Sequence, residues 1–206
     1  TPVDVSGIST ATSIALGDFH SCALLTDGTV WCWGDNEYGQ LGDGGTTTRF
    51  TPDDLIWLHA PPPPSPPSSP PSPPPPPSSP PPSPVGTSPA TSIALDGWHS
   101  CALLTDGAIN CWGDNGYGKL GDGSTTDSTN PVKVSGISTA TSIALDGLHS
   151  CALLSGGTIK CWGWNYHGQL RDGTTTDRTG PDEVSDISTA TGIALGTANS
   201  CALLTG

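Results

Sequence analysis

Cysteines are the residues of this chain whose type and spacing could do chemistry. Six of the seven form three pairs with nine residues between the partners, namely Cys22 and Cys32, Cys101 and Cys111, and Cys151 and Cys161. Paired thiols form disulfides or bind metal as thiolates. The spacing differs from the Cys-x2-Cys of zinc modules, and no histidine recurs at ligand distance. It therefore favours disulfides. We expect Cys201 to be unpaired in this chain, with a partner beyond its last residue.

The elements around each cysteine pair predict how the sulfurs are brought together. His20–Leu25 and Thr29–Trp33 flank Thr26-Asp27-Gly28, which is typical of a β-hairpin with a short glycine-containing loop. A three-residue loop sets Cys22 opposite Cys32, with Cα atoms about 4.5 to 5.5 Å apart. A disulfide can span that distance and would stabilise the hairpin by about 3 kcal/mol. Disulfides persist in oxidising compartments, which predicts a location outside the cytosol.

The hairpin belongs to a repeated unit. Ala-Thr-Ser-Ile-Ala-Leu, His-Ser-Cys-Ala-Leu-Leu and Cys-Trp-Gly recur about three and a half times, and Cys101, Cys151 and Cys201 follow one another at equal intervals. A period of this kind indicates a solenoid or a propeller. Four short strands are expected in the first copy, near Ser13–Leu16, His20–Leu25, Thr29–Trp33 and Pro52–Leu55. The prediction is an all-β fold with the strand content of propeller blades.

Histidine and serine also recur in each unit, directly before the first cysteine. A residue that returns in every copy is expected to be a structural hydrogen-bonding group rather than a catalyst, and no nucleophile motif accompanies it. The prediction is therefore that the chain is not an enzyme. The positions concerned are His20, His99, His149, Ser21, Ser100, Ser150 and Ser200, and the isolated histidines are His59 and His167.

Aspartates lie in the glycine-rich loops. Their oxygens could bind calcium, but the spacing does not fit an EF-hand loop, and turn formation is the commoner role of Asp-Gly. We expect no metal and no cofactor. The tryptophans of Cys-Trp-Gly are expected to pack between blades, while Trp57 and Trp98 are less regular, and Trp57 is the better candidate for an exposed contact. The aspartates concerned are Asp35, Asp43, Asp114, Asp122 and Asp172.

Charge excludes two classes of partner. The chain has 6 basic and 19 acidic residues and a net charge of −13. Binders of nucleic acid need a basic face, and anionic membrane surfaces attract basic segments. No stretch is long and apolar enough to span a bilayer. We therefore expect neither nucleic-acid binding nor membrane insertion.

One segment interrupts the repeats. Pro61–Pro84 contains only proline and serine. Proline has a fixed φ and no N–H, so the segment should form a polyproline II rod of about 3.1 Å per residue, near 75 Å if fully extended. A plain stiff linker and a ligand for SH3-like domains, which bind Pro-x-x-Pro, are the alternatives to a glycosylated rod.

The repeat as a whole resembles that of the RCC1 (regulator of chromosome condensation) family. The resemblance rests on Trp-Gly followed by Gly-Gln-Leu-Gly, as in Trp33-Gly34 with Gly39-Gln40-Leu41-Gly42. The sequence departs from the pattern at Lys119, Arg171 and Asn199. The resemblance implies RCC1-like β-propeller blades, about three and a half of an expected seven. The expected boundaries are blade 1 at 1–58, the Pro/Ser-rich insert at 59–88, blade 2 at 89–135, blade 3 at 136–185 and a partial blade 4 at 186–206.

The insert is similar to the Ser-Pro-n motifs of extensin-like, hydroxyproline-rich glycoproteins of green-algal surfaces. That resemblance implies prolyl hydroxylation and O-linked arabinose or galactose. The expected sites are Pro62, Pro63, Pro64, Ser65, Pro66, Pro67, Ser68, Ser69, Pro70, Pro71, Ser72, Pro73, Pro74, Pro75, Pro76, Pro77, Ser78, Ser79, Pro80, Pro81 and Pro82.

Together these features predict an extracellular structural glycoprotein. A disulfide-bonded propeller with a glycosylated rod would build a cell wall, a surface coat or an extracellular or flagellar filament, with copies of itself or other wall or filament glycoproteins as partners. The alternative is a secreted recognition module that binds carbohydrate or protein through a propeller face. An intracellular RCC1-like exchange factor or scaffold fits the cysteines less well.

Overall fold

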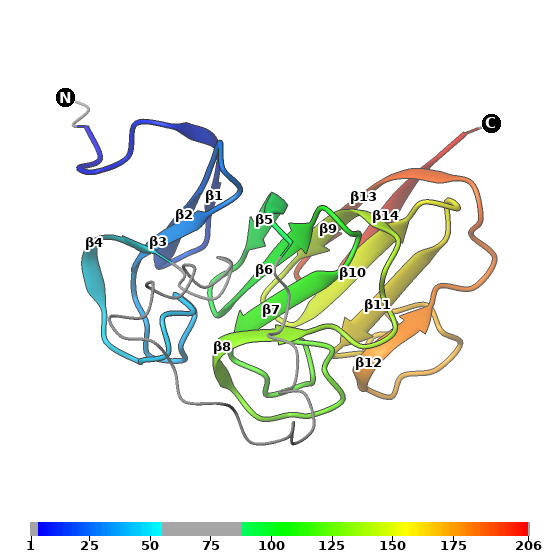
Figure 1. The fold of residues 1–206 in the computed structure, drawn as a ribbon. Coiled ribbons are helices and arrows are strands. Elements are labelled where there is room, and N and C mark those ends of the chain that lie inside the picture. The colour runs from blue at the N-terminus through cyan, green and yellow to red at the C-terminus, as the bar shows by residue number, and fades with distance from the viewer. Residues whose placement is uncertain (1–3, 55–87, 206) are drawn as a thin grey trace, which may run out of the picture.

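The computed structural model describes residues 4–54 and 88–205, and its regular structure is entirely β. The predicted all-β fold is confirmed. The strands run in chain order (Figure 1) as β1 (Ala11–Leu16), β2 (His20–Leu25), β3 (Val30–Gly34), β4 (Arg49–Asp54), β5 (Ala90–Leu95), β6 (His99–Leu104), β7 (Ile109–Gly113), β8 (Ser128–Lys133), β9 (Ala140–Leu145), β10 (His149–Leu154), β11 (Ile159–Gly163), β12 (Arg178–Glu183), β13 (Ala190–Gly196) and β14 (Asn199–Leu204).

The strands form antiparallel sheets that correspond to the repeats. Three sheets have four strands each, in the orders β1-β2-β3-β4, β5-β6-β7-β8 and β9-β10-β11-β12, and β13 pairs with β14. Each four-stranded sheet is one propeller blade. The hairpin register is the one predicted, because Leu24 lies opposite Val30 and Cys22 opposite Cys32. Gly28 takes the positive φ of 82° that the loop requires.

The two edge strands of blade 1, β1 and β4, differ from the prediction at their boundaries. β4 begins at Arg49, three residues before Pro52, and Leu55 lies outside the described residues. The prediction placed this strand near Pro52–Leu55. β4, however, is the outer strand of its sheet and has a neighbouring strand on one side only. An edge strand tolerates a proline such as Pro52, because an N–H that faces away from the neighbouring strand forms no hydrogen bond within the sheet. β1 begins at Ala11 because a register shift between Ala11 and Ser13 extends its pairing with β2.

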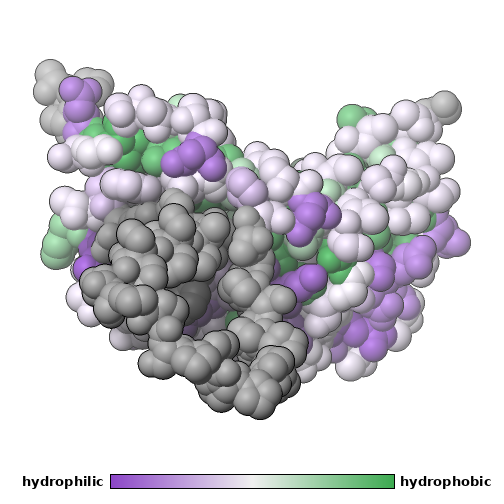
Figure 2. Space-filling view, viewed as in Figure 1, coloured by the Kyte–Doolittle hydropathy of each residue, from purple (hydrophilic) through white to green (hydrophobic). Residues whose placement is uncertain are grey.

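Successive blades lie side by side and bury the core between them (Figure 1). The first strand of each blade contacts the first strand of the next, from β1 through β5 and β9 to β13. One buried cluster joins Cys22, Val30 and Leu41 of blade 1 to Trp112 of blade 2. Figure 2 shows hydrophobic colour only in small separate areas of the described surface on this side. A single blade could not cover this apolar surface alone.

A backbone joint repeats at each blade boundary. The N–H of the first residue of β5, Ala90, donates to the carbonyl of Gly28 at 3.1 Å, and the same bond returns from Ala140 to Gly107 and from Ala190 to Gly157. A Cβ on Gly28 would lie 2.3 Å from Cβ of Pro89, so glycine is required there by contact as well as by φ.

The Pro/Ser insert falls between complete blades. β4 ends at Asp54 and β5 begins at Ala90, so the insert joins the outer strand of blade 1 to the inner strand of blade 2. The predicted polyproline II segment lies outside the described residues, as do His59 and Trp57. Within residues 4–54 and 88–205, no helix is long and apolar enough to cross a membrane.

Candidate functional site

The cysteines predicted to pair are joined in each of the three blades. Cys22–Cys32, Cys101–Cys111 and Cys151–Cys161 are disulfides, each with Cα atoms 4.1 Å apart. The N–H of Leu25 donates to the carbonyl of Thr29, and hydrogen-bonded pairs alternate along an antiparallel hairpin. The cysteines therefore fall at a non-hydrogen-bonded position, where opposing Cα atoms approach closest. All six are buried.

Cys201 is the free cysteine of the described chain, and it is exposed on β14. It lines a cavity of about 290 Å³ between the third blade and β14, together with Cys151, Gln169 and Arg171. At the preceding boundary the ring of Trp162 occupies this place. It lies among Cys101, Lys119 and Gly121, which are equivalent to Cys151, Gln169 and Arg171.

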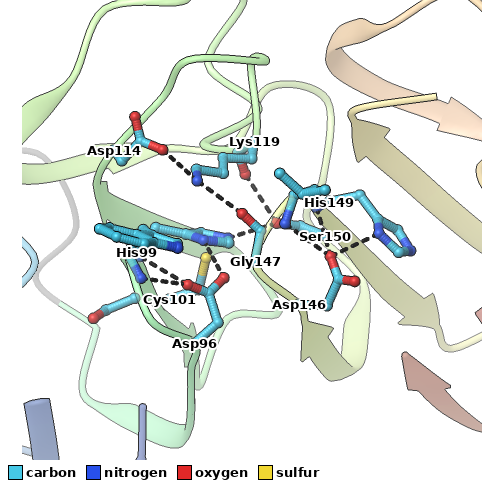
Figure 3. A network of polar contacts seen from close by, with 12 residues as sticks. Asp96, His99, Cys101, Asp114, Lys119, Asp146, Gly147, His149 and Ser150 are labelled. Atoms are coloured by element: carbon cyan, nitrogen blue, oxygen red, sulfur yellow. Dashed lines mark hydrogen bonds and ion pairs between the residues drawn. The ribbon is translucent and has the colours of Figure 1, made fainter. Parts of the chain in front are cut away.

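A hydrogen-bonded network connects each blade to the next (Figure 3). Nε2 of His99 in blade 2 lies 2.9 Å from Oγ of Ser150 in blade 3. Ser150 Oγ donates to the carbonyl of Lys119 at 2.9 Å, and Nε1 of Trp162 donates to the same carbonyl at 2.8 Å. Histidine, serine and tryptophan thus act as structural groups between blades, as predicted. The equivalent set at the first boundary is His20, Ser100, Gln40 and Trp112.

The single proton of the serine hydroxyl sets the direction of the hydrogen bonds in this network. The serine hydroxyl has one proton, which it donates to the Lys119 carbonyl, so Nε2 of His99 must donate to the serine. Nδ1 of His99 forms an ion pair with the carboxylate of Asp96. Burial would raise the pKa of Asp96, but the charge and hydrogen bond of His99 and the N–H groups of Trp98 and His99 lower it. His149 repeats the arrangement with Asp146 at 2.8 Å.

Asp96, His99 and Ser150 have the connectivity of a catalytic triad, but the network cannot work as one. A nucleophilic serine gives its proton to histidine and faces a substrate. Here the serine proton goes to a backbone carbonyl, and both His99 and Ser150 are completely buried between blades. The arrangement joins blades and leaves no room for a substrate.

The first blade lacks the carboxylate of this network. Gly17-Asp18 stands where blade 2 has Asp96-Gly97, and among the described residues Nδ1 of His20 has no hydrogen-bond partner. Burial lowers the pKa of His20 to about 4, although the charge of Asp96 opposes this shift. His20 is therefore neutral at pH 7.

This difference makes stability depend on pH. A histidine whose folded pKa lies below its unfolded value of 6.5 binds more protons when unfolded, so stability falls as pH drops from 6.5 to about 4. We expect His20 to account for a loss of about 3 kcal/mol over this window. His20→Gln keeps an N–H for Ser100 and should flatten the slope, as measured by urea unfolding from pH 7 to 4. An unchanged slope in the variant would exclude His20 as its source.

The loop aspartates considered for calcium accept bonds from protein groups. Asp43 accepts from the amide of Asn36 and pairs with Arg49 at 2.8 Å. Asp172 does the same with Asn165 and Arg178, and although burial opposes the shift, the N–H of Thr174 and Arg178 hold its pKa at about 2. Asp35 accepts a hydrogen bond from Gln40, and Asp114 forms an ion pair with Lys119. Asp122 accepts hydrogen bonds from Asn115 and from the N–H of Ser124. These contacts give the loops their shape.

Arg171, one of the departures from the repeat pattern, has a strained backbone. Its φ is 51°, whereas the equivalent Gly42 and Gly121 have φ near 70°. A left-handed conformation costs a non-glycine residue about 1 to 2 kcal/mol, which the entropy of glycine partly offsets. Arg171→Gly should therefore stabilise the chain by about 0.5 to 1 kcal/mol in urea unfolding. Gly136→Ala tests the reverse, because its φ is 65° and no atom lies within 4 Å of an added Cβ. Loss of stability in Arg171→Gly would contradict the argument.

Exposed and half-buried aromatic side chains gather on the loops at the end of the blades where β2 begins and β3 ends. Trp98 lies 5.8 Å from Phe19 and 5.4 Å from Tyr38 between ring centroids. At the next boundary Trp164 lies 6.3 Å from Tyr117 and 6.1 Å from Tyr166. We call these the aromatic row, which consists of Phe19, Tyr38, Trp98, Tyr117, Trp164 and Tyr166.

The two halves of the aromatic row are connected through blade 3. The ring of Trp98 lies 3.9 Å from the position that a Cβ on Gly147 would occupy. The next residue, Leu148, accepts a hydrogen bond at its carbonyl from the backbone N–H of Trp164 at 2.9 Å. Sequence reasoning considered Trp98 but ranked Trp57 above it and missed the tyrosines. The available signal was tyrosine recurring in Asn-x-Tyr-Gly at Tyr38 and Tyr117.

Comparisons with known proteins agree with this architecture. Two family models, each described as the regulator of chromosome condensation (RCC1) repeat, match the chain. One covers residues 11–40, 91–119 and 141–169, and the other covers residues 27–62 and 106–153. The probable E3 ubiquitin-protein ligase HERC4 of Homo sapiens is 32% identical over 118 residues, which are 57% of this chain and 9% of that protein.

Solved structures show the same fold. The crystal structure of human WBSCR16 superposes with a TM-score of 0.73 at 21% identity, over 95% of this chain and 45% of that one. Yeast RCC1 (Prp20), solved bound to Kap60, gives 0.69 at 21% identity, over 97% of this chain and 44% of that one. The chain therefore spans less than half the length of these relatives.

Proposed function

Because the chain belongs to the family of regulator of chromosome condensation (RCC1) repeat proteins, we propose that its blades serve as the rigid head of an extracellular structural glycoprotein. The observation that carries the proposal is the buried disulfide repeated in every four-stranded blade. Three such bonds are costly to maintain in a reducing compartment and are stable outside the cell. The setting is a cell wall, a surface coat or an extracellular filament of the kind found in green algae.

The insert supplies the second half of the proposal. It lies between β4 and β5 in the chain, so a rod formed by its prolines and serines would interrupt neither sheet. Polyproline II needs no partner strand and holds its side chains in solvent, where hydroxyproline and serine are open to O-glycosylation. The head gives resistance to unfolding, and the rod gives reach. Copies of the chain and other wall glycoproteins are the proposed partners.

The proposal assigns no catalytic activity to this region. Its triad-like network is buried between blades, and the segment similar to HERC4 is 9% of that protein. An intracellular scaffold of the RCC1 type is the competing function. It predicts free thiols and an unmodified insert.

Mass spectrometry of the native protein separates the two. Alkylation in denaturant without reductant should leave the six hairpin cysteines unlabelled, and peptides covering residues 61–84 should carry a ladder of pentoses on hydroxyproline or serine. The same sample reduced before alkylation is the control and should label all six. Labelled hairpin cysteines together with an unmodified insert would reject the extracellular assignment and favour the scaffold.

A further inference from the structure

The aromatic row has the exposure expected of a binding surface. Tyr166 is 69% exposed, Phe19 57%, Tyr117 41% and Trp98 38%, although large aromatic side chains normally gain by burial. Their rings contact one another across blade boundaries, from Tyr38 to Trp98 and from Tyr117 to Trp164. Two successive boundaries therefore present the same kind of surface, and a ligand that repeats along its own length could contact both.

Charge around the row restricts the ligand. Asp18 and Glu37 are exposed beside Phe19 and Tyr38, and Oδ2 of Asp18 lies 2.8 Å from a Cβ built on Gly97, next to Trp98. The cation at this end of blade 2, Lys119, is buried and paired with Asp114. These carboxylates would repel anionic ligands from the half of the row that contains Phe19, Tyr38 and Trp98. Ionised carboxylates are acceptor-only, so the ligand should be uncharged and rich in hydrogen-bond donors.

Two uncharged ligands can be compared by their donors. The prolines of the Pro/Ser segment have no backbone N–H, so its hydrogen-bond donors are limited to the serines and most of its polar groups are carbonyl acceptors that carboxylates cannot bind. A sugar offers an apolar C–H face that stacks on Trp or Tyr and hydroxyl donors that bind carboxylates. The combination of exposed rings with Asp18 and Glu37 fits the sugar better.

We infer that the aromatic row binds uncharged carbohydrate, namely the glycans on the Pro/Ser segment of a second copy. The inference rests on the proposed function for the source of the sugar. A fully extended rod, near 75 Å long, would carry its glycans away from its own head and present them to neighbouring heads. Repeated head-to-rod contacts that do not close on themselves build a fibre or a network.

The test uses the oxidised full chain produced without glycans, titrated by calorimetry with a neutral arabinose oligosaccharide and with the unglycosylated peptide of residues 61–84. We expect saturable binding of the oligosaccharide that added salt leaves unchanged, and no binding of the peptide. Tyr166→Ala should weaken binding about tenfold, because Tyr166 is the most exposed ring of the row. Phe50→Ala is the matched control, since Phe50 is a 93% exposed aromatic on β4, outside the row.

Each other outcome overturns the inference in a distinct way. Equal binding of the bare peptide would mean that the row binds polyproline, and an unaffected Tyr166→Ala would place any sugar site elsewhere. Trp98→Phe, which keeps an aromatic ring, serves as a second variant and should change affinity less than Tyr166→Ala. If the oligosaccharide binds but native residues 61–84 carry no sugar, the second copy is excluded as the source and the proposed function also fails. If the native insert is glycosylated and the oligosaccharide does not bind, the inference about the aromatic row fails and the proposed function is unaffected.

Discussion

Replacing Cys101 and Cys111 together by alanine will lower the free energy of unfolding by about 3 kcal/mol in urea. The pair closes a loop with a sequence separation of 10, and the cost is mainly the conformational entropy that the unfolded hairpin regains. Both residues are completely buried against strands of blades 2 and 3, so the loss of two sulfur atoms adds a small packing cost. Blade 2 is the best place for the test because it has a blade on each side.

The matched control is Cys201→Ala, which removes an exposed thiol that forms no disulfide in the described chain and should change stability by less than about 0.5 kcal/mol. If the three hairpin disulfides act independently, removing all of them costs about 9 kcal/mol, comparable to the whole stability of a typical domain. An unchanged urea midpoint in the double variant would show that the disulfide contributes nothing to the folded head.

The cysteine positions could be predicted because a hairpin fixes its own register. A three-residue loop after Leu25 decides every later pair, and Cys22 and Cys32 needed no tertiary information. The outer strand was harder, because Pro52 gives a breaking signal whose effect depends on which side of the sheet is open. That is a property of the assembled sheet, and β4 accordingly starts at Arg49.

The network between blades could be predicted only in part. Recurrence indicated that His99 is structural, but its partner Ser150 lies 51 residues away, and only the packed blades show that each histidine reaches the serine of the next repeat. The ion pair between His99 and Asp96 spans only three residues, but Asp96 was not among the residues that the sequence singled out. The order Gly17-Asp18 in blade 1 looks equivalent in composition, yet it leaves Nδ1 of His20 without the carboxylate.

Differences between the repeats also change which polar groups are paired, and the residue types alone do not show this. Gln40 donates to Asp35 and Lys119 pairs with Asp114, so the replacement of Gln by Lys at this position keeps a buried contact to a carboxylate. In blade 3 Trp164 replaces the aspartate, and within the described residues Nε2 of Gln169 has no hydrogen-bond partner. The same change brings Trp164 into the aromatic row. Blade 3 thus has a less satisfied buried amide and a larger exposed aromatic surface.

Trp112→Ala should cost about 3 to 5 kcal/mol, the range typical of removing a fully buried large aromatic side chain. The indole of Trp112 is 1% exposed and fills the space between blades 1 and 2 beside Cys22 and Leu41. Its Nε1 donates to the carbonyl of Gln40 at 2.8 Å, but Ser100 donates to the same carbonyl at 2.9 Å, so the acceptor keeps one partner. Most of the cost is therefore the cavity.

Two further variants separate packing from hydrogen bonding in urea unfolding. Trp112→Phe loses the N–H and part of the ring and should cost about 1 to 2 kcal/mol. Trp33→Ala removes the equivalent residue of blade 1, which is only half-buried, and should cost less than Trp112→Ala. Because repeats are stabilised through their neighbours, Trp112→Ala should also weaken the coupling of blade 1 to blade 2 and broaden the transition or divide it in two. Equal losses in Trp33→Ala and Trp112→Ala would mean that the tryptophan stabilises its own blade, and the cohesion of the head would then depend on the His99 network and the backbone joints.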